Sequence, residues 1–153
     1  MIRSFQSTDT EKLVELLRLN TPRFFDQSEE KDFIDYLKLH AKNYLVIEHE
    51  GVVIGGGGIN YGFDSGKTAR ISWDVIHPDF QGKGIGTKLT NYRINEVKKH
   101  SEINMLVVRT TQLVFEFYQK LGFVLEKKEK DYWSEGYDLY LMKMDLNKDN
   151  AQD

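Results

Sequence analysis

A glycine-rich stretch carries the residues of this chain that are best suited to bind an anion. Gly82, Gly84 and Gly86 follow an apolar run that ends at His77-Pro78, and apolar residues at helical spacing come after them. A strand should end at the proline, which cannot donate to a sheet ladder, and a helix should begin behind the glycines. The first amides of a helix lack intrahelical acceptors, and glycines let a ligand approach the backbone. This turn is therefore expected to bind a phosphate or pyrophosphate.

The spacing of the glycines excludes two common phosphate loops. A Walker A loop requires G-x-x-x-x-G-K-[ST], and neither lysine of the stretch stands in that frame. A dinucleotide fingerprint requires G-x-G-x-x-G, but Thr87 occupies the place of its last glycine. The stretch does match Q-x-x-G-x-G, through Gln81, Gly84 and Gly86.

This pattern, between a predicted strand and a predicted helix, resembles the coenzyme A pyrophosphate loop of the GNAT superfamily of N-acyltransferases, [QR]-x-x-G-x-[GA]. A later stretch resembles a second motif of the family, N-x-x-A-x-x-x-Y-x-K-x-G-F. Four of its positions match, at Tyr118, Lys120, Gly122 and Phe123. Two depart, because Thr111 stands where the family has asparagine and Val114 where it has alanine.

The resemblance implies an N-acetyltransferase that transfers the acetyl group of acetyl-CoA to a primary amine, by direct attack in a ternary complex. The donor-binding loop that it implies consists of Gln81, Gly82, Lys83, Gly84, Ile85, Gly86 and Thr87. Thr111 and Tyr118 would lie near the pantetheine and the sulfur, and Tyr118 would protonate the leaving thiolate. The strand backbone at Asp74, Val75 and Ile76 would pair with the pantetheine and stabilise the oxyanion.

Asp74 is the candidate general base. It is the only carboxylate between Thr68 and His77, and a charged side chain within a buried strand needs a partner or a function. It either accepts the proton of the amine, directly or through water, or hydrogen-bonds to a neighbouring hydroxyl or amide. Arg70 stands where some family members carry a basic glutamate, so the base is Asp74 or a water.

The acceptor is expected to be a small-molecule or peptide amine. Its site would be built from variable elements, for which Phe25, Asp26 and Trp133 are the candidates. Acidic residues at Asp26, Glu135 and Asp138 favour a cationic amine. Two alternatives stay open: a non-catalytic acyl-CoA sensor of the same fold, or an acyltransferase with another acyl donor or a hydroxyl acceptor.

The elements that must position these residues follow from apolar periodicity and turn signals. Strands are predicted over residues 2–5, 44–48, 52–61, 68–76, 103–108, 123–127 and 137–144, with helices between 8 and 19, 28 and 37, 85 and 97, and 111 and 121. Thr8 and Glu11 would form a capping box, Ser28 would cap the second helix, and Thr110 or Thr111 the last. A loop that contains residues 131–136 would join the last two strands.

This order indicates an α/β (α+β) fold, and the resemblance implies a mixed, mostly antiparallel central sheet of six or seven strands, splayed between strands 4 and 5 and flanked by about four helices. We expect one domain over residues 1–146 and a polar tail over 147–153. No apolar run approaches the roughly 20 residues of a membrane span, and the start lacks a signal-peptide core. A cytoplasmic protein without membrane attachment is therefore expected.

The charge and the metal-ligating residues narrow the choice of partners further. The net charge of −3 argues against nucleic acid as a partner. The chain has no cysteine, and its four histidines show no ligand spacing, so no metal is expected. A homodimer is consistent with the family resemblance.

Overall fold

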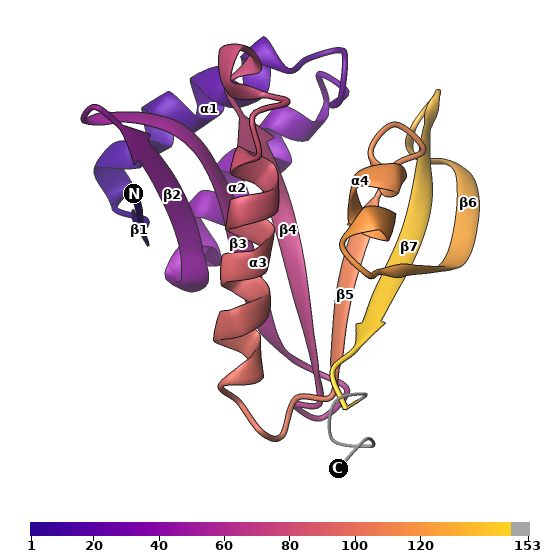
Figure 1. Ribbon diagram of the computed structural model, residues 1–153. Coiled ribbons are helices and arrows are strands. Elements are labelled where there is room, and N and C mark those ends of the chain that lie inside the picture. Colours follow the sequence, from indigo (N-terminus) through magenta and orange to yellow (C-terminus); the bar gives the residue numbers. More distant parts are fainter. Residues whose placement is uncertain (148–153) are drawn as a thin grey trace. The chain divides into compact units, whose positions relative to one another are not determined.

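The central sheet of the computed structural model has seven strands in the order β1-β2-β3-β4-β5-β7-β6, and the structure describes residues 1–147 (Figure 1). The strands are β1 (Ile2–Ser4), β2 (Tyr44–His49), β3 (Val52–Phe63), β4 (Thr68–Ile76), β5 (Met105–Thr110), β6 (Val124–Ser134) and β7 (Tyr137–Asp145). The helices are α1 (Thr10–Leu19), α2 (Glu29–Leu39), α3 (Ile85–Lys98) and α4 (Phe115–Lys120), with 3-10 turns η1 (Ser7–Asp9), η2 (Ala41–Asn43) and η3 (Pro78–Phe80). The predicted order of strands and helices is confirmed.

Strand pairing in the sheet is mixed, as predicted. β2 pairs antiparallel with β1 and β3, and β7 pairs antiparallel with β5 and β6. β4 and β5 pair in parallel, from Thr68 opposite Met105 to Ile71 opposite Val108. The pairs end there although β4 continues to Ile76, as the predicted splay requires.

The chain divides into two compact units. The first comprises Met1–Ile59 and Trp73–Asn91, and the second comprises Asn60–Ser72 with the described residues from Tyr92 onward. The single domain expected over residues 1–146 stays a prediction. The predicted polar tail lies outside the described residues, apart from Asn147.

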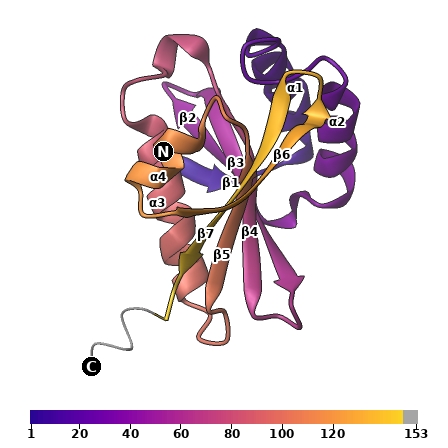
Figure 2. The same ribbon diagram turned by 90° about the vertical axis from the view of Figure 1, so that its right-hand side faces the viewer.

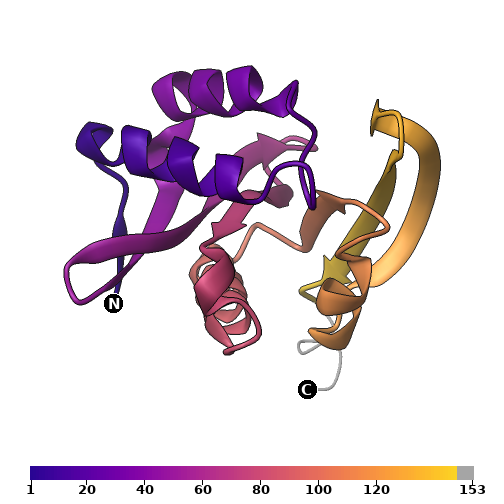
Figure 3. The same cartoon turned by 90° about the horizontal axis from the view of Figure 1, so that it is seen from above.

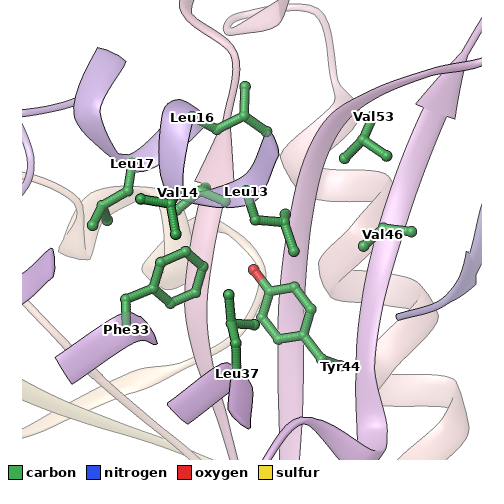
Figure 4. Close-up of a cluster of buried hydrophobic side chains, with 10 residues drawn as sticks. Leu13, Val14, Leu16, Leu17, Phe33, Leu37, Tyr44, Val46 and Val53 are labelled. Carbon is green, nitrogen blue, oxygen red and sulfur yellow. The ribbon is translucent and has the colours of Figure 1, made fainter. Parts of the chain in front are cut away.

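The core of the first unit lies between the helix pair α1–α2 and one face of β2 and β3. Figure 3 shows α1 and α2 side by side, and Figure 4 shows the side chains that they bury together with those of the two strands. The labelled residues are Leu13, Val14, Leu16, Leu17, Phe33, Leu37, Tyr44, Val46 and Val53. Each fully buried leucine contributes about 1.5–3 kcal/mol, so this cluster fixes both helices against the strands.

The opposite face of β2 and β3 packs against the first turns of α3. Ile47 and Ile54 are buried there with Leu89. The alternation of Val46 with Ile47 sends neighbouring side chains to opposite faces, so both faces of the strands are covered.

The glycine run in β3 is explained by close neighbours. A Cβ atom at Gly56 would lie 2.6 Å from Cε1 of Tyr44, and one at Gly55 would lie 3.0 Å from the carbonyl oxygen of Val75. Larger residues would push β2 and β4 away from β3. The glycines therefore let the rings of the core lie directly on the strand.

In the second unit, β5, β7 and β6 lie side by side (Figure 2). Burial alternates along β5, where Leu106 and Val108 are buried but Val107 and Arg109 are half-buried. α4 packs against β7. The ring of Phe123, just after α4, is buried with its centroid 5.7 Å from that of Tyr118.

The predicted helix starts differ from the observed ones. The capping interaction expected at Thr8 and Glu11 lies earlier, where the Asp9 carboxylate accepts the Gln6 amide at 2.8 Å. The Ser28 side chain does not cap α2, because its hydroxyl donates to the Asp26 carboxylate.

The last helix is shorter than predicted. It begins at Phe115 and not at Thr110 or Thr111, because residues 111–114 form a turn. The hydroxyl of Thr111 accepts the amide of Leu113 at 3.2 Å within that turn.

The prediction of a loop that contains residues 131–136 is also wrong. β6 continues to Ser134, and only Glu135 and Gly136 form the turn to β7. Most side chains of β6 are exposed and charged, so the strand carries no apolar alternation by which it could be recognised. In the described part of the chain, no helix combines the length and apolarity needed to cross a membrane.

Candidate functional site

The glycine turn between η3 and α3 has the backbone of an anion site. Gly82 and Gly84 have φ of +74° and +82°, which side chains rarely tolerate. An added Cβ at either position would meet nothing within 4 Å. In the described chain, no backbone carbonyl accepts a hydrogen bond from the amides of residues 82–87. These amides, at the N-terminus of α3, are available to an anion.

The start of this turn is held by a side chain that the sequence did not point to. Asn20, buried at the end of α1, donates to the carbonyls of Leu16 at 2.8 Å and Ile76 at 3.0 Å. The side-chain amide of Gln81 donates to the Asn20 side-chain oxygen at 2.7 Å and to the Ile76 carbonyl at 3.0 Å. The Gln81 side chain thus binds the protein itself and positions the turn. The only sequence signal for Asn20 was a polar residue just after an apolar helix.

The first turn of α3 is fixed from both sides. Ile85 packs against the buried residues of β2 and β3. The hydroxyl of Thr90 donates to the Gly86 carbonyl at 2.8 Å. Lys83 is exposed, with its ammonium 5.5 Å from the centroid of the Phe80 ring, and adds positive charge beside the free amides. Thr87 is half-buried in the same turn.

The strand before the turn is distorted at Trp73, whose φ is +53°. A bulky residue in this left-handed region costs about 1–3 kcal/mol and persists only where its surroundings hold it. The Tyr44 hydroxyl donates to the Trp73 carbonyl at 2.8 Å, and the Trp73 ring lies 5.0 Å from that of Phe33. This distortion directly precedes Asp74.

The three strand residues predicted to contact the donor follow Trp73. Asp74 is half-buried, Val75 is buried and Ile76 is half-buried. The Ile76 carbonyl is occupied by Asn20 and Gln81. Within the first unit, Trp73, these residues and the glycine turn belong to one continuous stretch of chain.

The candidate acceptor residues of the α1–α2 loop are engaged within the first unit. The Phe25 ring stacks on Trp73 at 6.3 Å between centroids, with an interplanar angle of 17°. The Asp26 carboxylate accepts the amide of Ser28 at 3.0 Å. Contact of Phe25 or Asp26 with an acceptor stays a prediction.

Tyr118 belongs to the second unit and is 4% exposed. Its ring makes edge contacts with Phe117 at 5.0 Å and Phe123 at 5.7 Å between centroids. Thr111, which replaces the asparagine of the motif, uses its hydroxyl to accept the amide of Leu113. The candidate residues therefore fall in both units.

Trp133 lies in β6 of the second unit and not in a loop. Its indole N–H donates to the Thr110 carbonyl at 3.2 Å. The guanidinium of Arg109 lies 5.3 Å from the centroid of its ring. Among the described residues, no group of three or more His, Cys, Asp or Glu side chains is placed to hold a metal ion.

Comparisons with known proteins agree with these motifs. Residues 10–123 match the family described as Acetyltransferase (GNAT) family. An N-alpha-acetyltransferase from Sulfurisphaera tokodaii is 27% identical over a match that covers 92% of this chain and 90% of that protein. An uncharacterized N-acetyltransferase, ycf52, from Porphyra purpurea is 42% identical over 62 residues, which are 40% of this chain and only 34% of that protein.

A solved structure shows the same fold. The protein yncA from Salmonella typhimurium, determined with its cofactor acetyl-CoA, has a TM-score of 0.71 at 22% identity and covers 97% of this chain and 94% of its own. The predicted fold is thereby confirmed. The family match includes both the glycine turn and the segment from Tyr118 to Phe123. The chain therefore belongs to the acetyltransferase (GNAT) family of acyltransferases.

Proposed function

We propose that this protein is an acetyl-CoA-dependent N-acetyltransferase that acts on a primary amine by direct attack in a ternary complex. The observation that carries the proposal is the glycine turn, where no carbonyl of residues 1–147 accepts a bond from the amides of residues 82–87. This turn occurs in a chain of the GNAT family. The relative from Sulfurisphaera tokodaii is called an N-alpha-acetyltransferase, which agrees with an amine acceptor.

The residues present fit the donor that the family implies. The amides of residues 82–87 would bind the pyrophosphate, with the dipole of α3 and the charge of Lys83 in support. Gly82 and Gly84 leave open space where a Cβ would stand, so phosphate oxygens can approach the backbone. The strand at residues 74–76 would hold the pantetheine arm.

Acetyl-CoA supplies an acetyl group that is activated as a thioester. The amine nitrogen forms a bond to the carbonyl carbon, and the bond from that carbon to sulfur breaks. The backbone amides of Asp74 to Ile76 would donate to the oxygen on which negative charge develops. Tyr118 would give its phenolic proton to the leaving sulfur, which yields a neutral thiol, and the phenolate would regain a proton from solvent.

The amine must lose a proton for the amide product to be neutral. Asp74 would accept this proton, directly or through a water, and return it to solvent after the product leaves. The left-handed backbone of Trp73 supports this role, because it is strained directly before Asp74 and such strain is common at functional sites.

The test is release of coenzyme A thiol from acetyl-CoA in the presence of a panel of amines and peptides. Thiol release should require an amine, and mass spectrometry should find one acetyl group on that amine. If acetyl-CoA binds but thiol release never depends on an amine or peptide, transfer to an amine is wrong.

A further inference from the structure

Two arginines lie on one face of the parallel strand pair in the second unit. The register places Arg70 of β4 opposite Val107 of β5, and side chains alternate along a strand, so Arg109 shares the face of Val107 and Arg70. Burial lowers the pKa of Arg70, and the positive charge of Arg109 lowers it further. The two cations are thus close enough to repel each other.

Neither guanidinium forms an ion pair within the described residues 1–147. The Arg70 guanidinium lies 3.9 Å from the centroid of the Phe63 ring. The Arg109 guanidinium lies 5.3 Å from the centroid of the Tyr132 ring and donates a hydrogen bond to the Tyr132 hydroxyl. Stacking on rings leaves the in-plane N–H groups of a guanidinium available to an anion.

The nearby carboxylate that acts on Arg70 is already engaged. The negative charge of Asp64 raises the pKa of Arg70, but burial and the charge of Arg109 each lower this pKa by more. The Asp64 carboxylate also accepts a hydrogen bond from the Thr68 hydroxyl at 2.7 Å. The pair therefore keeps an excess of positive charge. An anion from outside the chain would relieve the repulsion between the two arginines.

The face that carries the arginines is the more open one. On this face Thr68 is buried, but the residues from Arg70 onward are half-buried, namely Arg70, Ser72, Val107 and Arg109. The residues of the opposite face are buried, namely Ala69, Ile71, Leu106 and Val108. A small ligand can thus reach the arginines from the half-buried face.

The end of the β6–β7 hairpin, beside Arg109, is held in place by hydrogen bonds. The Trp133 indole donates to the Thr110 carbonyl, and the side-chain amide of Gln112 donates to the Gly136 carbonyl at 2.7 Å. The backbone amide of Asp138 donates in turn to the side-chain oxygen of Gln112 at 2.9 Å. These bonds hold the hairpin against the end of β5, so the rings beside Arg109 are positioned before a ligand arrives.

Two of the three acidic residues that favoured a cationic acceptor accept hydrogen bonds within the chain. The Asp138 carboxylate accepts the Asp131 amide at 2.9 Å, and the Asp26 carboxylate accepts the Ser28 amide at 3.0 Å. These two carboxylates are thus partly occupied within the chain, whereas neither arginine of the pair has a carboxylate at ion-pair distance among residues 1–147.

We propose that Arg70 and Arg109 bind a carboxylate of the acceptor, which makes the acceptor a small amine of the amino-acid class. Two guanidinium groups match the geometry and charge of a carboxylate. The amino group of the same molecule would be the nucleophile. This inference rests on the proposed function and adds the class of its substrate.

The test compares free L-amino acids with their α-carboxamides as acceptors. The two forms share the amine and the side chain, and differ in the carboxylate. The wild type should prefer a free amino acid, and Arg70→Gln or Arg109→Gln should raise KM for it by about 10- to 100-fold, with little change in kcat. The carboxamide should respond little to either substitution, and Arg109→Lys should keep part of the preference.

Lys127→Gln is the matched control, because it removes one positive charge from an exposed position of β6. It should leave both KM values unchanged. Thermal unfolding of each variant would show that the fold is retained, and Arg109→Lys serves where a glutamine variant does not fold.

Calorimetry with acetyl-CoA separates the outcomes. The affinity for acetyl-CoA should be the same in all variants. A large loss of this affinity in the arginine variants would place the two arginines in the donor site and refute the inference. If the wild type binds acetyl-CoA but neither binds nor acetylates a free amino acid, or prefers the carboxamide, the inference is wrong while the proposed function stands. If acetyl-CoA does not bind at all, the proposed function fails and this inference with it.

Discussion

The side-chain amide of Gln81 donates a hydrogen bond to the side-chain oxygen of Asn20 at 2.7 Å. Both side chains also donate to the carbonyl of Ile76, each at 3.0 Å. The end of α1, the end of β4 and the start of the glycine turn therefore meet at one point. In this protein the side chain of the motif glutamine binds the protein itself and holds the start of the turn.

Removal of either partner should loosen the turn. Asn20→Ala and Gln81→Ala should each lower the free energy of unfolding by about 1–3 kcal/mol, because each leaves buried polar groups without a partner. Each should also weaken acetyl-CoA binding. Urea denaturation and calorimetry measure the two effects, and Gln27→Ala, at an exposed position, should change neither.

A double-mutant cycle tests whether the two side chains act together. The coupling free energy between Asn20→Ala and Gln81→Ala should be about 0.5–3 kcal/mol. Strict additivity of the two unfolding free energies would show that the bond between them contributes nothing.

The glycine at the centre of the turn should matter through its backbone. Gly84→Ala should cost about 1–2 kcal/mol of stability, because alanine is strained at a φ of +82°. Gly66→Ala is the matched control, since Gly66 has a φ of +85° and likewise nothing within 4 Å of an added Cβ. Both should lower Tm alike, but only Gly84→Ala should weaken acetyl-CoA binding. An equal loss of binding in both variants would argue against donor contacts at the turn.

Tyr118 should act in turnover and not in donor binding. Tyr118→Phe should lower kcat by about 100-fold or more, because the leaving thiolate loses its proton donor. The dissociation constant for acetyl-CoA should change little, and Tyr92→Phe, at an exposed tyrosine of α3, should have no effect on kcat. Steady-state kinetics and calorimetry give the two values. Unchanged kcat in Tyr118→Phe would remove this tyrosine from the mechanism.

Stability at acidic pH should depend on Asp9. Hydrogen bonds from the Arg3 guanidinium hold the pKa of the Asp9 carboxyl below its ordinary value of 3.8. The stabilisation is therefore complete above the unfolded-state pKa and is lost as the pH falls through the lower folded-state pKa. Asp9→Asn should cost about 1–3 kcal/mol at pH 7, and its deficit should shrink under strongly acidic conditions. Thermal unfolding of both proteins across pH checks this, and a deficit that is independent of pH would contradict it.

Much of the fold was predictable, because regular apolar patterns marked the buried strands and helices. β4 was predicted with its observed ends, since Gly66 and Pro78 bound an apolar run. β6 was cut short because its edge position needs no apolar face, and seven consecutive residues of it are exposed. The start of α4 was misplaced because the apolar Leu113 and Val114 lie in a turn.

The site was predictable only where the backbone requires a particular residue. Glycines at positive φ and a strand-ending proline fixed the place of the turn. The contacts of Asn20, Gln81 and Arg109 are made with residues far away in the sequence, as in the bond between Asn20 and Gln81, 61 residues apart. No local pattern reveals such partners.

The most direct measurement is isothermal titration of the wild-type protein with acetyl-CoA. The turn at residues 82–87 predicts saturable binding with one site per chain, and Gly84→Ala should weaken it while Gly66→Ala should not. Absence of binding up to millimolar acetyl-CoA would contradict the assignment of the turn as the donor site, and with it the proposed reaction.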